Sequence, residues 1–377
     1  MEEWKEYRLG EVVNILDYKR IPLSSAERKT REGGFPYYGA QGIIDYIDDY
    51  IFDGTYLLIA EDGENLKSKK QDIAQLAHGK YWVNNHAHIV ESNGICDIRY
   101  LCYILNNIDL SGYITGSAQP KLNQANLSAI SIILPSLNLQ EQIADFISMF
   151  DNKIELNRRI NDNLEQQAQA LFNYYFIDTP ALLGELSVGS LADAANYVNG
   201  LAMQKYRPIN GKKGLPVLKI KELGQGRIDA SSDFCSNEID SYYKVYDGDV
   251  IFSWSGTLMV KIWCGGKCGL NQHLFKVSSK TTPKWFYYFW TKHHLDNFIR
   301  IAKDKAVTMG HIKRGELEKA EVLFPNSSVM KKLDTLMTPY LDQIIEKECE
   351  IRKIALLRDT LLPKLISGEL KINDINN

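Results

Sequence analysis

Apolar positions along the chain fall into two matching series. Residues 115–135 read TGSAQPKLNQANLSAISIILP and residues 305–325 read KAVTMGHIKRGELEKAEVLFP. Few letters agree, yet Leu122 corresponds to Ile312 and Pro135 corresponds to Pro325 at one constant offset. The same offset continues without a gap as far as Leu171 and Leu361. A register that holds over this length indicates an internal duplication.

The constant part of each copy has the pattern of a long helix. Residues 139–175 contain no Pro or Gly, and their apolar residues recur mostly at steps of three and four. In the second copy, Thr338–Pro339 resembles an N-cap followed by a first helical proline, so we expect a separate short helix or a kink there. The predicted helix-pairing residues are Ile143, Phe146, Phe150, Ile154, Leu164 and Leu171 in the first copy, and Leu333, Leu336, Tyr340, Ile344, Ile354 and Leu361 in the second.

The part that precedes each helix has a mixed pattern. YLLIAEDG at 56–63 and DVIFSWSG at 249–256 are short apolar runs ending in Gly, which predicts strands followed by turns. The denser runs YLCYILNN at 100–107 and WFYYFWTKHH at 285–294 predict short helices. WVNNHAHIV at 82–90 matches GLNQHLFKV at 269–277 at a shifted offset. Each copy is therefore a globular part of variable length followed by a helix of constant length.

These patterns predict an α+β fold. A helix of about 35 residues is about 50 Å long, more than one small domain can cover. We therefore expect the two helices to pack as an antiparallel coiled coil that joins two tandem α/β domains with pseudo-two-fold symmetry. The predicted divisions are a first globular domain at 1–137, a first helical spacer at 138–180, a second globular domain at 181–327, and a second spacer with the C-terminal tail at 328–377.

Composition adds limits to this picture. The chain has 377 residues, 45% hydrophobic and 24% charged, with a net charge of −3, so any basic surface is local. No run approaches the roughly 18 apolar residues of a membrane helix, and the start MEEWKEYRLGE lacks an apolar signal core. Six scattered cysteines favour free thiols over a disulfide framework. We expect a cytoplasmic protein.

Two unlike globular parts on a spacer of constant length suit duplex DNA. DNA has a local two-fold axis, and half-sites on one face recur about every 34–36 Å. Unlike domains would then read unlike half-sites. A helical adaptor or scaffold that holds two protein partners has the same organisation, and this alternative stays open at this point.

Several segments resemble the specificity (S) subunits of type I restriction–modification enzymes. They are WKEYRLGEVV at 4–13, FPYYGAQGIIDYIDDYIFDGTYLLIAEDG at 35–63, SAQPKLNQANLSAISIILPSLNLQEQIADF at 117–146 and LLPKLISGELKI at 361–372. The resemblance covers essentially the whole chain. The second copy departs most from it, because MGHIK at 309–313 replaces QPKLN at 119–123.

The resemblance implies a non-catalytic DNA-recognition subunit in which the two globular domains are target-recognition domains. Each reads one half of a bipartite site, and the helices bind two methyltransferase (M) subunits that methylate adenine. Restriction (R) subunits add ATP-dependent cleavage. S-adenosylmethionine, ATP and Mg²⁺ are then expected on partner subunits, with no cofactor, metal site or catalytic residue in this chain. In agreement, the sequence has no Asn-Pro-Pro or Asp-Pro-Pro methylation motif, dinucleotide-type glycine turn or phosphate loop.

DNA contacts are expected from Arg, Lys, Asn, Gln, Ser and Thr side chains, with occasional Tyr and His. In the first copy the candidates are Tyr38, Gln41, Lys67, Lys69, Lys70, Lys80, Asn84, Asn85, His86, Gln119 and Lys121. In the second copy they are Gln204, Lys205, Lys219, Lys221, Ser255, Asn271, Gln272, His273, Thr308, His311 and Lys313.

The matching triplets at 84–86 (NNH) and 271–273 (NQH) have two interpretations. They are either polar loops that face DNA or a shared turn whose side chains satisfy backbone groups. His86 and His88 also alternate along one predicted strand, but the sequence places no third metal ligand near them.

Overall fold

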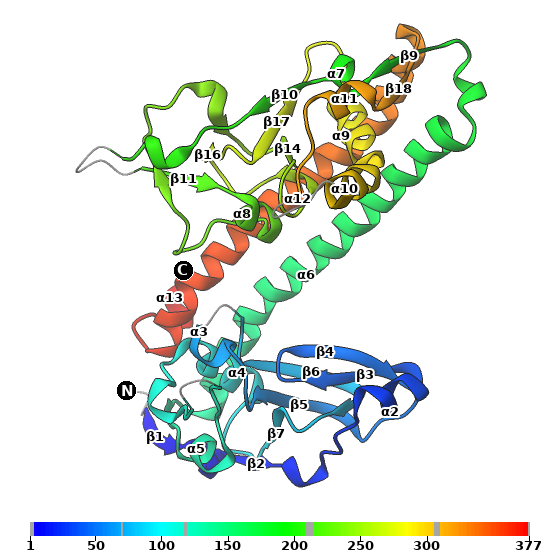
Figure 1. Ribbon diagram of the computed structural model, residues 1–377. Coiled ribbons are helices and arrows are strands. Elements are labelled where there is room, and N and C mark those ends of the chain that lie inside the picture. The colour runs from blue at the N-terminus through cyan, green and yellow to red at the C-terminus, as the bar shows by residue number, and fades with distance from the viewer. Residues whose placement is uncertain (1–3, 69–70, 117–118, 209–213, 305–309, 376–377) are drawn as a thin grey trace. The chain divides into compact units, whose positions relative to one another are not determined.

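The computed structural model describes residues 4–68, 71–116, 119–208, 214–304 and 310–375 (Figure 1). The chain folds as two compact units. Unit 1 contains Met1–Asp151 together with Leu357–Asn377, and unit 2 contains Asn152–Leu356. Among the described residues, no helix combines the length and the hydropathy needed to cross a membrane.

Unit 1 is built on a six-stranded sheet with the order β2-β7-β5-β6-β3-β4. The pairs are antiparallel except for β3 and β6, which run parallel. The predicted apolar run YLLIAEDG belongs to the β5 strand, whose last four residues are all buried. The strand bounds are β2 Val13–Ile15, β3 Glu32–Gly39, β4 Gly42–Ile47, β5 Phe52–Ala60, β6 Ala74–Val83 and β7 Ala87–Ser92.

Helix α4 (Ile98–Asn107) confirms the predicted short helix of unit 1 and packs on β5 and β6 (Figure 1). Asp97 caps it by accepting hydrogen bonds from the backbone N–H groups of Arg99 and Tyr100. A two-stranded ladder pairs β1 (Lys5–Arg8) with β8 (Ser131–Leu134). The other helical segments are α1 Leu9–Val12, η1 Asp17–Lys19, α2 Ser25–Thr30, α3 Asn65–Ser68, η2 Ser111–Tyr113, α5 Gln124–Ala129 and α13 Ile372–Ile375.

Unit 2 contains two four-stranded sheets, with the orders β10-β17-β14-β15 and β12-β11-β16-β13. The aromatic run at 285–294 forms α9 as far as His293, and the rings of its Trp, Phe and Tyr residues are buried in the core, as expected for so dense an apolar segment. The strands are β9 Leu186–Ser190, β10 Asn196–Asn199, β11 Leu215–Leu218, β12 Phe234–Cys235, β13 Lys244–Val245, β14 Asp249–Ser253, β15 Met259–Trp263, β16 Cys268–Leu270, β17 Leu274–Ser278 and β18 Glu321–Pro325. The short helices are η4 Pro180–Leu183, α7 Leu191–Ala194, η5 Met203–Lys205, α8 Ile220–Gln225, η6 Ser241–Tyr243, α9 Lys284–His293, α10 Leu295–Asp304 and α11 Gly315–Lys319.

The two units repeat one order of elements, which confirms the internal duplication. In unit 1, the strand before α1 pairs with the strand after α5. In unit 2, the strand before α7 pairs with the strand after α11 in the same antiparallel manner. A long helix follows in each copy, α6 (Leu137–Asn173), which continues into a π-helical turn at Tyr174–Asp178, and α12 (Ser327–Ile366).

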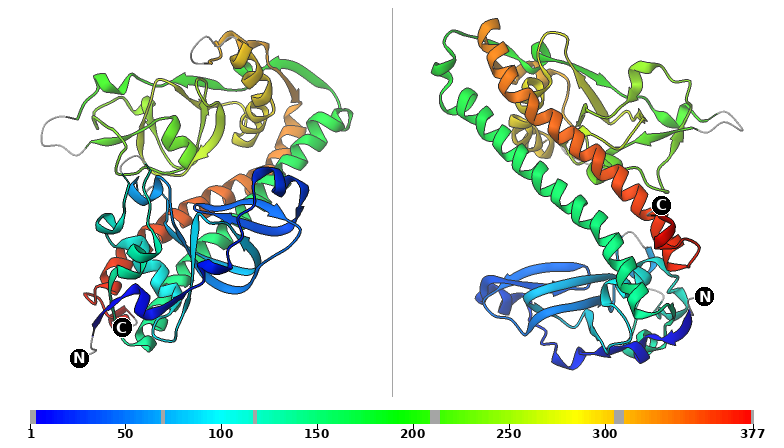
Figure 2. Two further views of the ribbon diagram at one scale, coloured as in Figure 1. Left: turned by 60° about the horizontal axis from the view of Figure 1, so that its bottom comes forward. Right: turned by 180° about the vertical axis from the view of Figure 1, so that it is seen from behind.

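Within unit 2, α6 and α12 lie side by side in antiparallel order (Figure 2). Asn161 Nδ2 donates to Glu348 Oε1 at 2.9 Å, and Lys153 Nζ lies 3.5 Å from Glu350 Oε1. Residue numbers therefore increase along α6 as they decrease along α12, as expected for antiparallel helices. Asn161 is 6% exposed, and a buried polar side chain between paired helices favours one register over its neighbours.

Within unit 1, the start of α6 and the end of α12 contribute to the core. Ile143 and Ile147 of α6 and Leu362 and Leu365 of α12 are buried in the same cluster as α4. Asp151 joins the three helices, because its carboxylate accepts from Arg358 Nη1 and from the hydroxyl of Tyr103, each at 2.6 Å. Each long helix therefore buries one part of its apolar stripe in unit 1 and another part in unit 2. This division explains why the stripe is longer than one domain can cover.

Most predicted helix-pairing residues are buried or half-buried. Ile143, Ile154 and Leu333 are buried. Leu336, in contrast, is 38% exposed. The half-buried positions are Phe146, Phe150, Leu164, Leu171, Tyr340, Ile344, Ile354 and Leu361.

The expected separate short helix before Thr338–Pro339 is wrong, because α12 runs through both residues. Proline removes one helical hydrogen bond and crowds the preceding turn. Met337 and Leu341, on either side of Pro339, are both 1% exposed in the core of unit 2. Tertiary packing on both sides of the proline therefore outweighs its local preference.

Candidate nucleic-acid interface

In unit 1, the segment before α5 is attached to the end of β5. Leu122 N–H donates to Glu61 C=O at 2.8 Å, and Gly63 N–H donates to Pro120 C=O at 3.3 Å. Asp62 and Lys121 pair as an isolated bridge between these bonds. Gly63 has φ +120°, a conformation that favours glycine at this turn. We call residues 61–63 with 119–122 the unit 1 junction.

Unit 2 builds the same junction with other side chains. Ile312 N–H donates to Trp254 C=O at 3.1 Å, and Gly256 N–H donates to Gly310 C=O at 3.0 Å. Ser255 and His311 form the equivalent isolated bridge. His311 therefore occupies the place of Lys121, at the same offset as the apolar repeat. We call residues 254–256 with 310–312 the unit 2 junction.

The triplets at 84–86 and 271–273 form one kind of turn beside these junctions. Asn84 Oδ1 accepts from His86 N–H at 2.8 Å, and Asn271 Oδ1 accepts from His273 N–H at 3.2 Å. Asn84 and Asn271 are only 6% and 8% exposed. This burial favours the structural interpretation for the first asparagine of each triplet.

The imidazole after each turn contacts its junction. His86 Nδ1 lies 2.6 Å from Asp62 Oδ2, and the His86 side chain is 49% exposed. His273 Nδ1 lies 3.0 Å from the hydroxyl oxygen of Ser255, and Gln272 Nε2 lies 3.3 Å from His273 Nε2. One geometry thus presents a histidine beside a carboxylate in unit 1 and beside a hydroxyl in unit 2.

Residues 1–166 match the family model of the type I restriction modification DNA specificity domain. The chain is 25% identical to the type I restriction enzyme MjaIX specificity subunit of Methanocaldococcus jannaschii, over 99% of this chain and 98% of that one. It is similar to the specificity subunit family of type I restriction–modification systems, over the first 166 residues in the family model and over nearly the whole chain in this relative.

Two further comparisons agree with this family. Over 145 residues the chain is 38% identical to S.HindORF215P of Haemophilus influenzae, whose name assigns it to the same class, and this match covers 38% of the chain and only 36% of that relative. The fold resembles the crystal structure of the type I S subunit from M. genitalium with a TM-score of 0.62, at 15% identity and coverage of 97% and 96%. Specificity subunits are non-catalytic components of these complexes.

Within the unit 1 junction, the carboxylate of Glu61 forms ion pairs with two cationic side chains. Glu61 Oε2 lies 2.7 Å from Arg20 Nη1, and Glu61 Oε1 lies 3.1 Å from Lys121 Nζ. Burial raises the pKa of Glu61, but the hydrogen bonds from Arg20 and Lys121 outweigh it and hold the pKa below its usual value. Lys121 remains 53% exposed, so its ammonium group has donors left for a ligand.

His88 supports the same junction from inside unit 1. Its Nδ1 lies 2.6 Å from Asp17 Oδ2, and its Nε2 lies 2.7 Å from the Leu122 carbonyl oxygen. Both ring nitrogens therefore lie within hydrogen-bond distance of an oxygen of unit 1. Asp17, Glu61 and His88 also have the atom types and spacing of a metal site. Arg20, however, already contacts both carboxylates, at 3.3 and 2.7 Å, which leaves little need for a metal cation.

The other unit 1 candidates are spread around this junction. Tyr38 is half-buried, with its ring 5.4 Å from that of Tyr81. Lys67 donates to Gly116 C=O at 3.0 Å, and Lys80 Nζ lies 4.5 Å from the ring centre of Tyr50. The exposed candidates are Gln41, Lys67, Lys80, Asn85, Gln119 and Lys121. Lys69 and Lys70 lie outside the described residues.

In unit 2, local acids neutralise two of the candidate cations. Lys219 pairs with Asp233, and Lys221 Nζ lies 2.9 Å from Asp229. Ser255 is 3% exposed. Gln272 and His273 are half-buried, whereas Gln204, Lys205, His311 and Lys313 are exposed. Thr308 lies outside the described residues.

Sequence reasoning missed the residues that hold the junctions. In unit 1, the junction contacts come from Arg20, Glu61 and Asp62. In unit 2, Trp254 Nε1 donates to Asn199 Oδ1 at 3.0 Å. The Trp254 ring lies 6.1 Å from that of His273 and 6.2 Å from that of His311. The sequence signal that could have found them is the pair of residues directly after each aligned strand, Glu61-Asp62 in the first copy and Trp254-Ser255 in the second.

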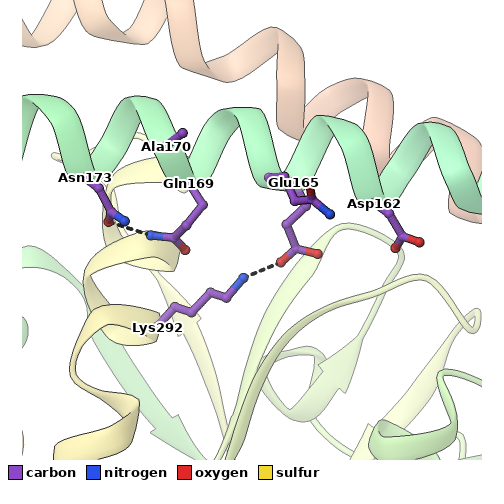
Figure 3. A pocket seen from close by; sticks show the side chains of 7 residues that line it. Asp162, Glu165, Gln169, Ala170, Asn173 and Lys292 are labelled. Atoms are coloured by element: carbon purple, nitrogen blue, oxygen red, sulfur yellow. Dashed lines mark hydrogen bonds and ion pairs between the residues drawn. The ribbon is translucent and has the colours of Figure 1, made fainter. Parts of the chain in front are cut away.

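A polar cavity of about 430 Å³ lies in unit 2 between α6 and α9 (Figure 3). Lys292 Nζ lies 2.6 Å from Glu165 Oε1, which also accepts from the Tyr288 hydroxyl at 2.8 Å. Burial raises the pKa of Glu165, but Lys292 outweighs it and leaves the pKa lowered. The lining residues are Asp162, Glu165, Gln166, Gln169, Ala170, Asn173 and Lys292.

We expect Lys292→Met to lower the free energy of unfolding by about 1 kcal/mol at pH 7, because both partners are partly exposed. A lowered carboxyl pKa contributes stability above the unfolded-state pKa that is lost as pH falls through the folded value. The difference from wild type should therefore shrink in urea titrations carried out near pH 3. Lys331→Met, at an exposed lysine of α12, is the control. A difference that stays constant with pH would contradict the ion-pair assignment.

Proposed function

We propose that this chain is the non-catalytic specificity subunit of a type I restriction–modification complex and that each unit reads one half of a bipartite DNA site. The observation that carries this proposal is the junction, built twice on equivalent backbone hydrogen bonds but with different side chains. Lys121 and His311 occupy one place, and Asp62 and Ser255 occupy another. A constant frame with varied polar groups is what reading two different half-sites requires.

The exposed polar groups at the junctions suit a nucleic acid. Lys121, with Gln119 beside it, offers donors to phosphate or base edges in unit 1. In unit 2, His311 is exposed and lies next to the Trp254 ring. The net charge of −3 is compatible with this role, because only the local field at the contact surface matters.

Partner subunits supply the chemistry in this proposal. Two M subunits dock on the long helices, where Leu156 and Leu356 of unit 2 are 51% and 69% exposed. They carry S-adenosylmethionine and methylate adenine, while R subunits with ATP and Mg²⁺ carry out cleavage. This chain contributes the choice of sequence.

Selection from random duplex DNA by the chain in complex with its M partner tests the proposal. The expected result is two conserved blocks separated by an unspecified spacer of constant length. Substitutions in the unit 1 junction should change one block and substitutions in the unit 2 junction the other. A single block, or no preferred sequence, would overturn the proposal and favour a protein-holding adaptor.

A further inference from the structure

The two junction histidines are held by equivalent contacts that differ in one chemical group. His86 in unit 1 and His273 in unit 2 follow the same asparagine turn, and each directs Nδ1 to its junction. The partner is the carboxylate of Asp62 in unit 1 and the hydroxyl of Ser255 in unit 2. The difference therefore lies in what holds the imidazole, not in how the backbone places it.

The group bonded to Nδ1 influences how Nε2, the other ring nitrogen, is presented. A carboxylate only accepts hydrogen bonds, so the contact with Asp62 places a proton on His86 Nδ1 and fixes the direction in which Nε2 points. Among the residues that the structure describes, no hydrogen-bond partner is recorded for His86 Nε2, and the side chain is half exposed. In unit 2, Gln272 Nε2 already lies 3.3 Å from His273 Nε2, and Ser255 carries no charge.

We propose that Asp62 is a positioning residue that directs His86 Nε2 at a base edge in the half-site read by unit 1. The inference rests on the proposed function. The base pairs differ in the pattern of donors and acceptors that they present in the major groove, so a ring nitrogen held in one direction discriminates among them. In unit 2, the partner is the Ser255 hydroxyl and Gln272 already lies against His273 Nε2, so the equivalent imidazole is not directed at a base in the same way. The residue at the Asp62/Ser255 position thus determines part of the base preference.

The test is selection from random duplex DNA by the chain in complex with its M partner, followed by affinity measurements on the selected sites. Asp62→Ser should reduce discrimination at one base position of one block by about tenfold and leave the other block unchanged. His86→Gln, at an exposed side chain, should relax the same position. Asp62→Asn keeps an acceptor without the charge and should give an intermediate loss. Ser255→Asp is the matched control, and it should alter only the other block.

The outcomes separate this inference from the proposed function. A wild-type chain that selects no sequence would overturn both. If wild type selects two blocks but Asp62→Ser leaves the profile unchanged, only the inference fails. It also fails if Asp62→Ser and His86→Gln weaken binding equally for all sequences, because that result identifies His86 as a phosphate contact. It fails again if the two variants relax different positions.

Discussion

Replacing His88 by alanine is expected to lower the free energy of unfolding of unit 1 by about 3–5 kcal/mol, because it leaves two largely buried acceptors without this partner, at about 1–3 kcal/mol each and more for a charged group. The side chain is 1% exposed and bridges Asp17 to the Leu122 carbonyl. Without it, the largely buried carboxylate of Asp17 loses one of its hydrogen-bond partners, and the Leu122 carbonyl oxygen loses the imidazole 2.7 Å away. The same loss releases Leu122 and therefore loosens the junction.

Urea unfolding of the full chain, followed by a probe in unit 1, measures this effect. His78→Ala is the matched control, because His78 is exposed on β6 and its Nδ1 lies 3.0 Å from the hydroxyl oxygen of Thr55. That variant should lose less than about 1 kcal/mol. Equal losses for the two variants would refute the role given to His88.

Lys121→Ala is expected to weaken DNA binding by about tenfold at low salt and to reduce the slope of log affinity against log salt by about 0.9. One phosphate contact releases about one counterion, so the change in slope is the specific sign of a phosphate partner. Glu61 holds the Lys121 ammonium at 3.1 Å and thereby limits its conformational freedom before DNA arrives.

Lys121→Arg keeps the charge and should retain the salt slope. Lys371→Ala, at an exposed lysine of the C-terminal segment, tests whether any lost cation has the same effect. Binding isotherms at several salt concentrations distinguish these cases. An unchanged slope for Lys121→Ala would remove Lys121 from the phosphate contacts, even if affinity fell.

Periodic and repeated features were accessible from the sequence. The apolar register from Leu122 onward predicted the matching junctions, because a repeated register requires a repeated backbone path. The helices expected at 100–107 and 285–294 and the strand expected at 56–63 were found because an element that is largely buried leaves a dense apolar run in the sequence. These features depend on neighbours in the chain.

Features that depend on distant residues were not accessible. Arg20 and Glu61 are 41 residues apart, and no local pattern indicates that they meet. Lys219 and Lys221 looked like free cations, but the fold brings Asp233 and Asp229 to them. Pro339 predicted a break that burial of the flanking residues overrides. In each case, tertiary contact decides against the local signal.

If the two units read two different half-sites as one bipartite target, methylation in the host should follow that target. Methylated adenines can be mapped across the host genome with this chain present and with it deleted. We expect one motif of two short specified blocks, separated by a spacer of constant length, with methylation lost on deletion. A continuous motif, a motif with a single block, or methylation unaffected by the deletion would contradict this expectation.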